Sequence, residues 1–236
     1  MMPVDFNTLA QQCAPGVHPT TLQALVRTES SFNPFAIGVV GGRLARQPNN
    51  RDEAVATVKA LDAAGWNYSM GLSQVNRANL GRYGLAGPDA VAAFDPCANL
   101  RAGSAILSDC YRRASRQMGT GQPALRAALS CYYSGNFQRG FVADSGSRYA
   151  PSSYVQRVVA NATPAATDLT PKANGPASAQ AIPVVPAVTP EQLGPGPIST
   201  HAPAHSTGRA ACAPCAGIRA CSVGRVWRLL SLPSFT

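Results

Sequence analysis

The sequence predicts an all-α or α-dominated (α+β) domain, followed by a Pro-rich tail that we expect to be disordered. In the first 160 residues, apolar side chains recur every three or four positions, and no alternating run of useful length indicates a large sheet. Beyond that point Pro, Ala, Thr, Gly and Ser dominate, so too little apolar surface remains to offset the entropy of ordering. We therefore predict a folded domain over 1–160, a Pro/Ala-rich disordered linker over 161–208, and a basic, Cys-containing tail of unknown structure over 209–236.

The first predicted helix, residues 19–32, carries a carboxylic acid on its apolar face. Leu22 and Leu25 share that face, and Glu29 continues the same spacing. Glu29 also lies near the helix C-terminus, where the helix dipole disfavours negative charge. Burial and the dipole both favour the protonated acid, which general-acid chemistry requires. The alternative is that Glu29 points to solvent where the helix frays.

Further helices are predicted from the same periodicity and from their end signals. Prolines stand in the first turn of two of them, and glycines follow the ends of two. The predicted segments are 52–64, 96–114, 123–134 and a short helix that starts near Ser152 or Ser153.

Polar and aromatic residues interrupt this pattern at three places. Amides and tyrosyl hydroxyls recognise sugar hydroxyls and N-acetyl groups by hydrogen bonding, and aromatic faces stack on pyranose rings. A protonated glutamate among such groups indicates a site that cleaves glycans. The residues concerned are Ser73, Gln74, Asn76, Tyr132, Tyr133 and Tyr154.

The order of four short motifs resembles the lysozyme-like lytic transglycosylase domain, and within it the lytic transglycosylase component of type IV secretion systems. The resemblance covers residues 1 to about 160. The motifs are Glu29-Ser30-x-Phe32-x-Pro34, Gly71-Leu72-x-Gln74, Tyr132-x-x-Gly135 and Tyr154-Val155.

The resemblance implies a role for each matched residue. Glu29 would be the catalytic acid and base, with Ser30 beside it. Tyr132 would lie against the carboxylate, and many relatives have an asparagine where this chain has Tyr133. The predicted substrate contacts are Ser30, Ser73, Gln74, Asn76, Tyr132, Tyr133 and Tyr154.

The implied reaction cleaves the bond between N-acetylmuramic acid and N-acetylglucosamine in peptidoglycan and leaves a 1,6-anhydro end. It would open the cell wall locally for a secretion or conjugation apparatus, with glycan strands as the substrate. It needs one carboxylate and no cofactor or metal, whereas most glycosidases use two carboxylates. A lysozyme-type muramidase and a non-catalytic peptidoglycan-binding assembly factor are the alternatives. Candidates for a second carboxylate are Asp52, Glu53, Asp62, Asp89, Asp95 and Asp109, each with a simpler cap or surface role.

Four cysteines in the folded part indicate two disulfides and an oxidising compartment, here the periplasm. We favour the pairs Cys13–Cys97 and Cys110–Cys131, with buried free thiols as the alternative. A further cluster in the tail, Cys212, Cys215 and Cys221, lacks the second C-x-x-C of a typical zinc site.

The net charge of +9 is spread along the chain without a nucleic-acid-binding motif, so we expect no nucleic-acid partner. A mildly basic surface suits an anionic polymer such as peptidoglycan. We expect no transmembrane segment and find no clear signal peptide at the N-terminus. The extended Pro-rich tail is expected to dock on secretion-system proteins.

Overall fold

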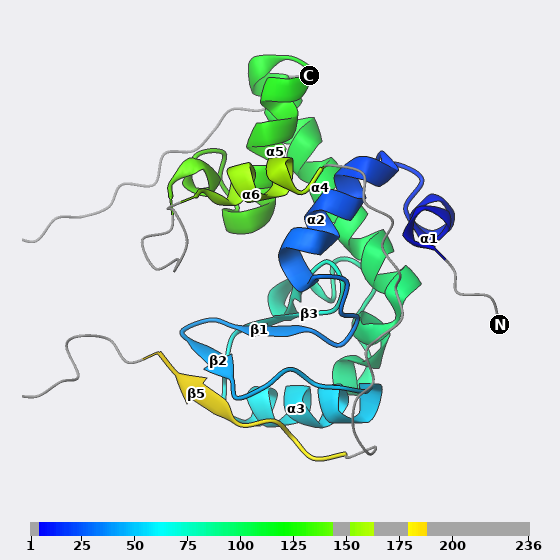
Figure 1. Ribbon diagram of the computed structural model, residues 1–236, viewed down its shortest axis with the longest axis vertical. Helices are drawn as coiled ribbons and strands as arrows, with labels where there is room; N and C mark the ends of the chain where they lie inside the picture. Colours follow the sequence, from blue (N-terminus) through cyan, green and yellow to red (C-terminus); the bar gives the residue numbers. More distant parts are fainter. Residues whose placement is uncertain (1–4, 144–151, 163–178, 188–236) are drawn as a thin grey trace, which may run out of the picture. The chain divides into compact units, whose positions relative to one another are not determined.

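The computed structural model describes residues 5–143, 152–162 and 179–187, apart from the side chains of residues 88–90 (Figure 1). Helices dominate these residues, which confirms the predicted fold class. The α-helices are α1 (Phe6–Cys13), α2 (Pro19–Ser30), α3 (Arg51–Ala63), α4 (Pro96–Met118), α5 (Gln122–Ser134) and α6 (Tyr154–Ala160). The 3-10 helices are η1 (Arg77–Asn79), η2 (Pro88–Phe94) and η3 (Arg139–Phe141). The strands are β1 (Ile37–Val39), β2 (Gly42–Leu44), β3 (Tyr68–Met70), β4 (Val75–Asn76) and β5 (Val184–Pro186).

One hydrophobic core lies among α1, α2, α4, α5 and α6. Leu22 and Leu25 of α2 are fully buried there, as the periodicity predicts, and Leu100 and Leu107 of α4 pack with them. Phe6 of α1 meets Phe32 edge to face, with ring centroids 5.2 Å apart. The sequence analysis missed α1, although Asp5 caps it and its apolar residues recur at helical spacing.

A second core lies between α3 and a small antiparallel sheet of strand order β1-β3-β4. Ile37 pairs with Met70, and Ser69 pairs with Asn76. Ala102 of α4 belongs to this second core, so α4 contributes to both. The turn at residues 71–74 joins β3 to β4 where the two cores meet, because Met70 packs in one core and Leu72 in the other.

Two disulfides fasten the helices around α4. Cys13 bonds to Cys97 with the Cα atoms 5.1 Å apart, which ties α1 to the first turn of α4. Cys110 bonds to Cys131 with the Cα atoms 5.7 Å apart, which ties α4 to α5. These are the two pairs that the sequence analysis favoured.

The prediction of a disordered linker over 161–208 is wrong for residues 179–187. There β5 pairs antiparallel with β2, with Val184 opposite Leu44. Ile182 is only 5% exposed in the second core, and its backbone N–H donates to Thr57 Oγ1 at 2.9 Å. Pairing and burial together offset the entropy of ordering this short stretch, although its composition is typical of a linker.

Parts of the predicted linker and the whole predicted tail lie outside the described residues. These are residues 163–178 and 188–208 of the linker, and residues 209–236 with Cys212, Cys215 and Cys221. Within the described part of the chain, no helix is long and apolar enough to span a membrane.

Candidate active site

Glu29 lies in the last turn of α2, on the helix face that also carries the buried Leu22 and Leu25. His18 caps the start of α2 by accepting the N–H of Thr20, and Ser31 ends the helix in the left-handed conformation, with φ 51°. Phe32 follows with φ 64°. In the described chain, Gln74 is the one other non-glycine residue with positive φ, and it belongs to the turn beside α2. Strained backbone of this kind clusters at functional sites.

A hydrogen bond ties the turn at residues 71–74 to α2. Ser30 Oγ donates to the Leu72 carbonyl at 2.7 Å, and this bond links the residue beside Glu29 to the turn. Gly71 has φ +79°, and a Cβ there would come within 2.5 Å of the Ala93 carbonyl. Only glycine therefore fits the first position of the turn.

The side chain of Asn99 in α4 holds the same turn in place through three hydrogen bonds. Its Oδ1 accepts the Ser73 N–H at 2.7 Å, and its Nδ2 donates to the carbonyls of Met70 at 3.0 Å and Ala93 at 2.8 Å. Asn99 is 1% exposed and uses all these groups, so it fixes the turn rather than contacting substrate.

Tyr154 contacts the candidate catalytic acid directly. Its hydroxyl donates to Glu29 Oε1 from the first position of α6. The exposed ring of Tyr133 stacks on the ring of Tyr154, with centroids 4.6 Å apart and planes 14° apart. The structure therefore joins three of the predicted residues in one chain of contacts, with Tyr133 outermost and Glu29 innermost.

Tyr132 approaches from the last turn of α5. Its hydroxyl donates to the Ser73 carbonyl at 2.5 Å, and Glu29 is close enough to raise the pKa of the Tyr132 phenol further above the value set by burial. A Cβ at position 103 of α4 would strike Ser73 Oγ and lie 3.3 Å from the Tyr132 hydroxyl. The absence of a side chain at Gly103 therefore lets Tyr132 reach the turn.

Burial raises the pKa of Glu29 from 4.5 to about 7. The hydrogen bond from Tyr154 and the positive charge of Arg157 both lower it, but by less than burial raises it. Burial also raises the pKa of Tyr154 well above 10, so this phenol keeps its proton and remains a donor. Because Tyr154 donates to Oε1, the protonated Glu29 carries its own hydrogen on Oε2, which points to chemistry at that oxygen.

Two predicted substrate contacts have other roles in this structure. Ser73 is fully buried, and its Oγ has no hydrogen-bond partner among the described residues, so its side chain lies beneath the site. Gln74 directs its Nε2 to the carbonyls of Ala36 at 2.9 Å and Gly71 at 3.0 Å. The buried Ser73 side chain would reach substrate only if the turn rearranged, whereas Gln74 is partly exposed and its contact with substrate stays a prediction.

No contact in the described chain links Asn76 to Glu29. Its Nδ2 donates to Asn67 Oδ1 at 2.9 Å and to Ser69 Oγ at 3.3 Å, and its Oδ1 accepts the Ala78 N–H at the start of η1. A role for Asn76 in substrate binding therefore remains a prediction from the resemblance.

Four of the six candidates for a second carboxylate have structural partners elsewhere, Asp52 is exposed in the first turn of α3, and the side chain of Asp89 lies outside the described residues. Asp95 caps α4, Asp62 pairs with Arg77, and Asp109 accepts bonds from two arginines and Tyr83. The carboxylate of Glu53 is buried against Arg46, whose hydrogen bonds lower its pKa to about 2. In the described residues, no acidic group alters the pKa of Glu29, and no cluster of three metal-ligating side chains occurs.

The sequence analysis missed Asn99 and Arg157. Asn99 is one helical turn before Gly103 on the buried face of α4, and an amide on an apolar stripe is a signal that could have revealed it. Arg157 lies 5.9 Å from the centroid of the Tyr154 ring and donates to the Ser152 carbonyl. No motif marked Arg157, because an arginine on a short terminal helix is usually a surface residue.

Comparison with known protein families identifies the family of this chain. The chain matches the family described as "Transglycosylase SLT domain" over residues 6–150. It belongs to that family. The matched region includes Glu29, Tyr132 and the turn at residues 71–74, while Tyr154 lies just beyond it.

Two groups of relatives extend the comparison. The chain is 59% identical over 160 residues to the "Type IV secretion system protein virB1" of Brucella suis biovar 1, over 67% of this chain and 64% of that protein. It is 34% identical over 139 residues to "Protein virB1" of Agrobacterium fabrum, over 58% of this chain and 54% of that protein. The chain therefore spans less than two thirds of the length of either relative. No solved structure matches it.

Proposed function

We propose that this protein is a peptidoglycan lytic transglycosylase in which Glu29 acts first as the acid and then as the base. The observation that carries the proposal is the carboxyl group of Glu29, half-buried, with a pKa of about 7 and a hydrogen bond from Tyr154. A carboxylic acid that keeps its proton near neutral pH is suited to protonate a leaving oxygen.

In the first step, Glu29 Oε2 gives its proton to the glycosidic oxygen that leaves C1 of N-acetylmuramic acid. The C1–O bond breaks with its electron pair on the departing oxygen. The acetamido group of the same sugar stabilises the positive C1, so no nucleophilic carboxylate from the protein is needed. Arg157 and the Tyr154 hydroxyl stabilise the carboxylate that Glu29 becomes, since both lower its pKa.

In the second step, the Glu29 carboxylate takes the proton of the C6 hydroxyl, and the C6 oxygen bonds to C1. The product is a 1,6-anhydro ring, water is not consumed, and Glu29 returns to its protonated form. A single group with a pKa near 7 serves both steps, because proton transfer is most effective when the pKa lies near the working pH.

The family and the names of the relatives support a place of action. The Brucella relative is named as a type IV secretion system protein, and the two disulfides of this chain suit an oxidising compartment. We infer that this protein acts in the periplasm and opens the cell wall locally for a secretion system. A complementation assay tests this role: the chain should restore secretion in cells that lack their own related component, and its Glu29→Gln variant should not.

The test of the chemistry is peptidoglycan clearing in a gel by the wild type, by Glu29→Gln and by Asp52→Asn as the matched control. Asp52 is an exposed acid in the first turn of α3, and its substitution makes the same change from carboxyl to amide. We expect Glu29→Gln to lose activity by at least about a hundredfold, the usual contribution of a general acid, and Asp52→Asn to keep it. Clearing by a folded Glu29→Gln variant would overturn the assignment. Loss in both variants would favour a two-carboxylate hydrolase.

A further inference from the structure

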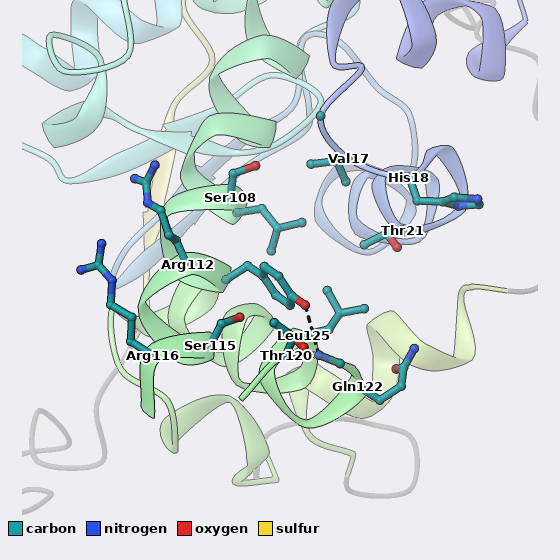
Figure 2. Close-up of a pocket in the computed structure, with 14 residues that line it drawn as sticks. Val17, His18, Thr21, Ser108, Arg112, Ser115, Arg116, Thr120, Gln122 and Leu125 are labelled. Atoms are coloured by element: carbon teal, nitrogen blue, oxygen red, sulfur yellow. Dashed lines mark hydrogen bonds between the residues drawn. The ribbon is translucent and has the colours of Figure 1, made fainter. Parts of the chain in front are cut away.

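A cavity of about 850 Å³ lies at the N-terminal end of α2 (Figure 2). Glu29 lies near the other end of this helix. It is lined by the start of α2, the second half of α4 and the start of α5. Thr21 lines it, and eight residues separate Thr21 from Glu29, which is roughly 12 Å along a helix. The cavity is therefore separate from the candidate active site, which lies at the C-terminal ends of α2 and α5.

Apolar side chains make up the floor of the cavity. Leu107 and Tyr111 come from α4, Leu125 from α5 and Val17 from the turn before α2. Leu107 is almost fully buried, and the other three are partly buried. A floor of this composition and size suits one or two apolar side chains of an incoming ligand.

Two hydroxyl groups in the lining have unused hydrogen-bonding capacity. The Tyr111 oxygen accepts the Gly121 N–H at 3.1 Å, and its own proton has no acceptor among the described residues. Ser115 Oγ is buried and has no hydrogen-bond partner in the described chain. Buried polar atoms normally have partners, so Ser115 Oγ points to a polar ligand, and the Tyr111 hydroxyl has a proton to donate to the same ligand.

The charge of the lining is entirely positive. Arg112 and Arg116 stand one helical turn apart on α4, along one margin of the cavity (Figure 2), and none of the described residues that line it is Asp or Glu. Arg112 shares a hydrogen bond with Asp109, whereas Arg116 is exposed and has no ion-pair partner in the described part of the chain. The arginines therefore favour an anionic ligand.

We propose that this cavity is a docking site for an acidic peptide segment of a partner protein. One or two apolar side chains of the segment enter the cavity, and flanking carboxylates pair with Arg112 and Arg116. Side chains two positions apart on an extended peptide are roughly 7 Å apart, close to the spacing of arginines one turn apart on a helix. The chain's own residues 191–236 are a poor match, because they hold one acidic side chain, Glu191, and four arginines.

The probe is an array of capped hexapeptides, each with two central Leu or Phe residues flanked by Asp and Glu. The fluorescently labelled full chain is tested as the wild type, as Arg116→Glu and as Arg112→Glu/Arg116→Glu. The matched control is Arg43→Glu/Arg126→Glu, which makes the same charge change at two exposed arginines outside the lining. Arg116→Glu keeps the contact between Arg112 and Asp109, so it separates lost docking from a disturbed α4.

We expect a subset of the acidic peptides to bind the wild type and the control, and to bind them more weakly at higher salt. The affinity of these peptides for both Arg116 variants should be at least tenfold lower. Peptidoglycan cleavage should stay unchanged in all four proteins. The proposal is overturned if no acidic peptide binds the wild type, if the Arg116 variants bind as well as the control, or if lysine-flanked peptides bind equally. If the wild type binds phosphatidylglycerol vesicles but no peptide, and the Arg116 variants lose the vesicle binding, the arginines belong to a membrane-binding surface and the proposal is also overturned.

Discussion

Replacing Glu29 by glutamine should stabilise the fold at neutral and alkaline pH and not at acid pH. Burial holds the pKa of Glu29 at about 7 in the folded chain, against an ordinary 4.5. Between these values the folded state holds the proton that the unfolded state has released. The stability of the wild type therefore falls as pH rises from 4.5 to 7, and it stays lower above 7.

The shift sets the size of the effect. A difference of one pKa unit corresponds to about 1.4 kcal/mol, so the ionised Glu29 costs about 3 kcal/mol above pH 7. Glutamine has no charge to desolvate, and its Oε1 still accepts the hydrogen bond from Tyr154. At pH 4 the wild-type acid is protonated as well, and the two proteins should differ by less than about 1 kcal/mol.

The assay is urea unfolding of both proteins at pH 4 and pH 8, with the disulfides intact. The difference between variant and wild type, compared at the two pH values, cancels the other titrating groups. Asp52→Asn is the control, and it should give no gain at pH 8. A gain of about 3 kcal/mol for Glu29→Gln at pH 8 alone supports a buried acid. Equal differences at both pH values would refute the reasoning, because they would show that Glu29 titrates at its ordinary value.

Three further predictions concern the support of the site and the fold. Tyr154→Phe keeps the ring that stacks on Tyr133 and removes a hydrogen bond that lowers the pKa of Glu29, so the alkaline limb of the pH–activity profile should move to higher pH; an unmoved limb contradicts this role. Replacing both cysteines of the Cys13–Cys97 pair by serine opens a loop of 84 residues and should lower the free energy of unfolding by about 4.5 kcal/mol. The same change at Cys110–Cys131, which closes 21 residues, should lower it by about 3 kcal/mol. Equal losses in urea unfolding would show that loop closure does not set the effect. Ile182→Ala should cost about 2–4 kcal/mol by the same method, and no loss would mean that residues 179–187 do not pack on the domain.

The sequence predicted the helices well because their signals are local. The apolar spacing of α2 identified both its buried face and the unusual position of Glu29. Prolines marked the starts of α4 and α5 and a glycine marked the end of α5, but α4 runs four residues beyond its predicted end at Ala114. The strands were missed because they span only two or three residues, too short for an alternating pattern. Residues 179–187 were misjudged because their order depends on pairing with β2, which is distant along the chain.

The sequence predicted which residues lie near Glu29 more accurately than it predicted what their side chains contact. Glu29, Tyr132, Tyr133 and Tyr154 do meet, since each motif stands at the end of a helix that the fold brings together. Ser73 and Gln74 were assigned to substrate because hydroxyls and amides recognise sugars, yet the Ser73 side chain is buried and the Gln74 amide bonds the backbone of a strained turn. A polar side chain in a loop can bind substrate or form hydrogen bonds with the nearby backbone, and the sequence alone does not distinguish these two roles.

The measurement that tests the central claim most directly is mass analysis of the fragments released from purified peptidoglycan in water enriched with oxygen-18. If Glu29 closes the anhydro ring without water, the wild type should release fragments with 1,6-anhydro ends and no heavy oxygen, and folded Glu29→Gln should release none. Fragments with reducing ends that carry the heavy oxygen, or anhydro products from the Glu29→Gln variant, would contradict the account.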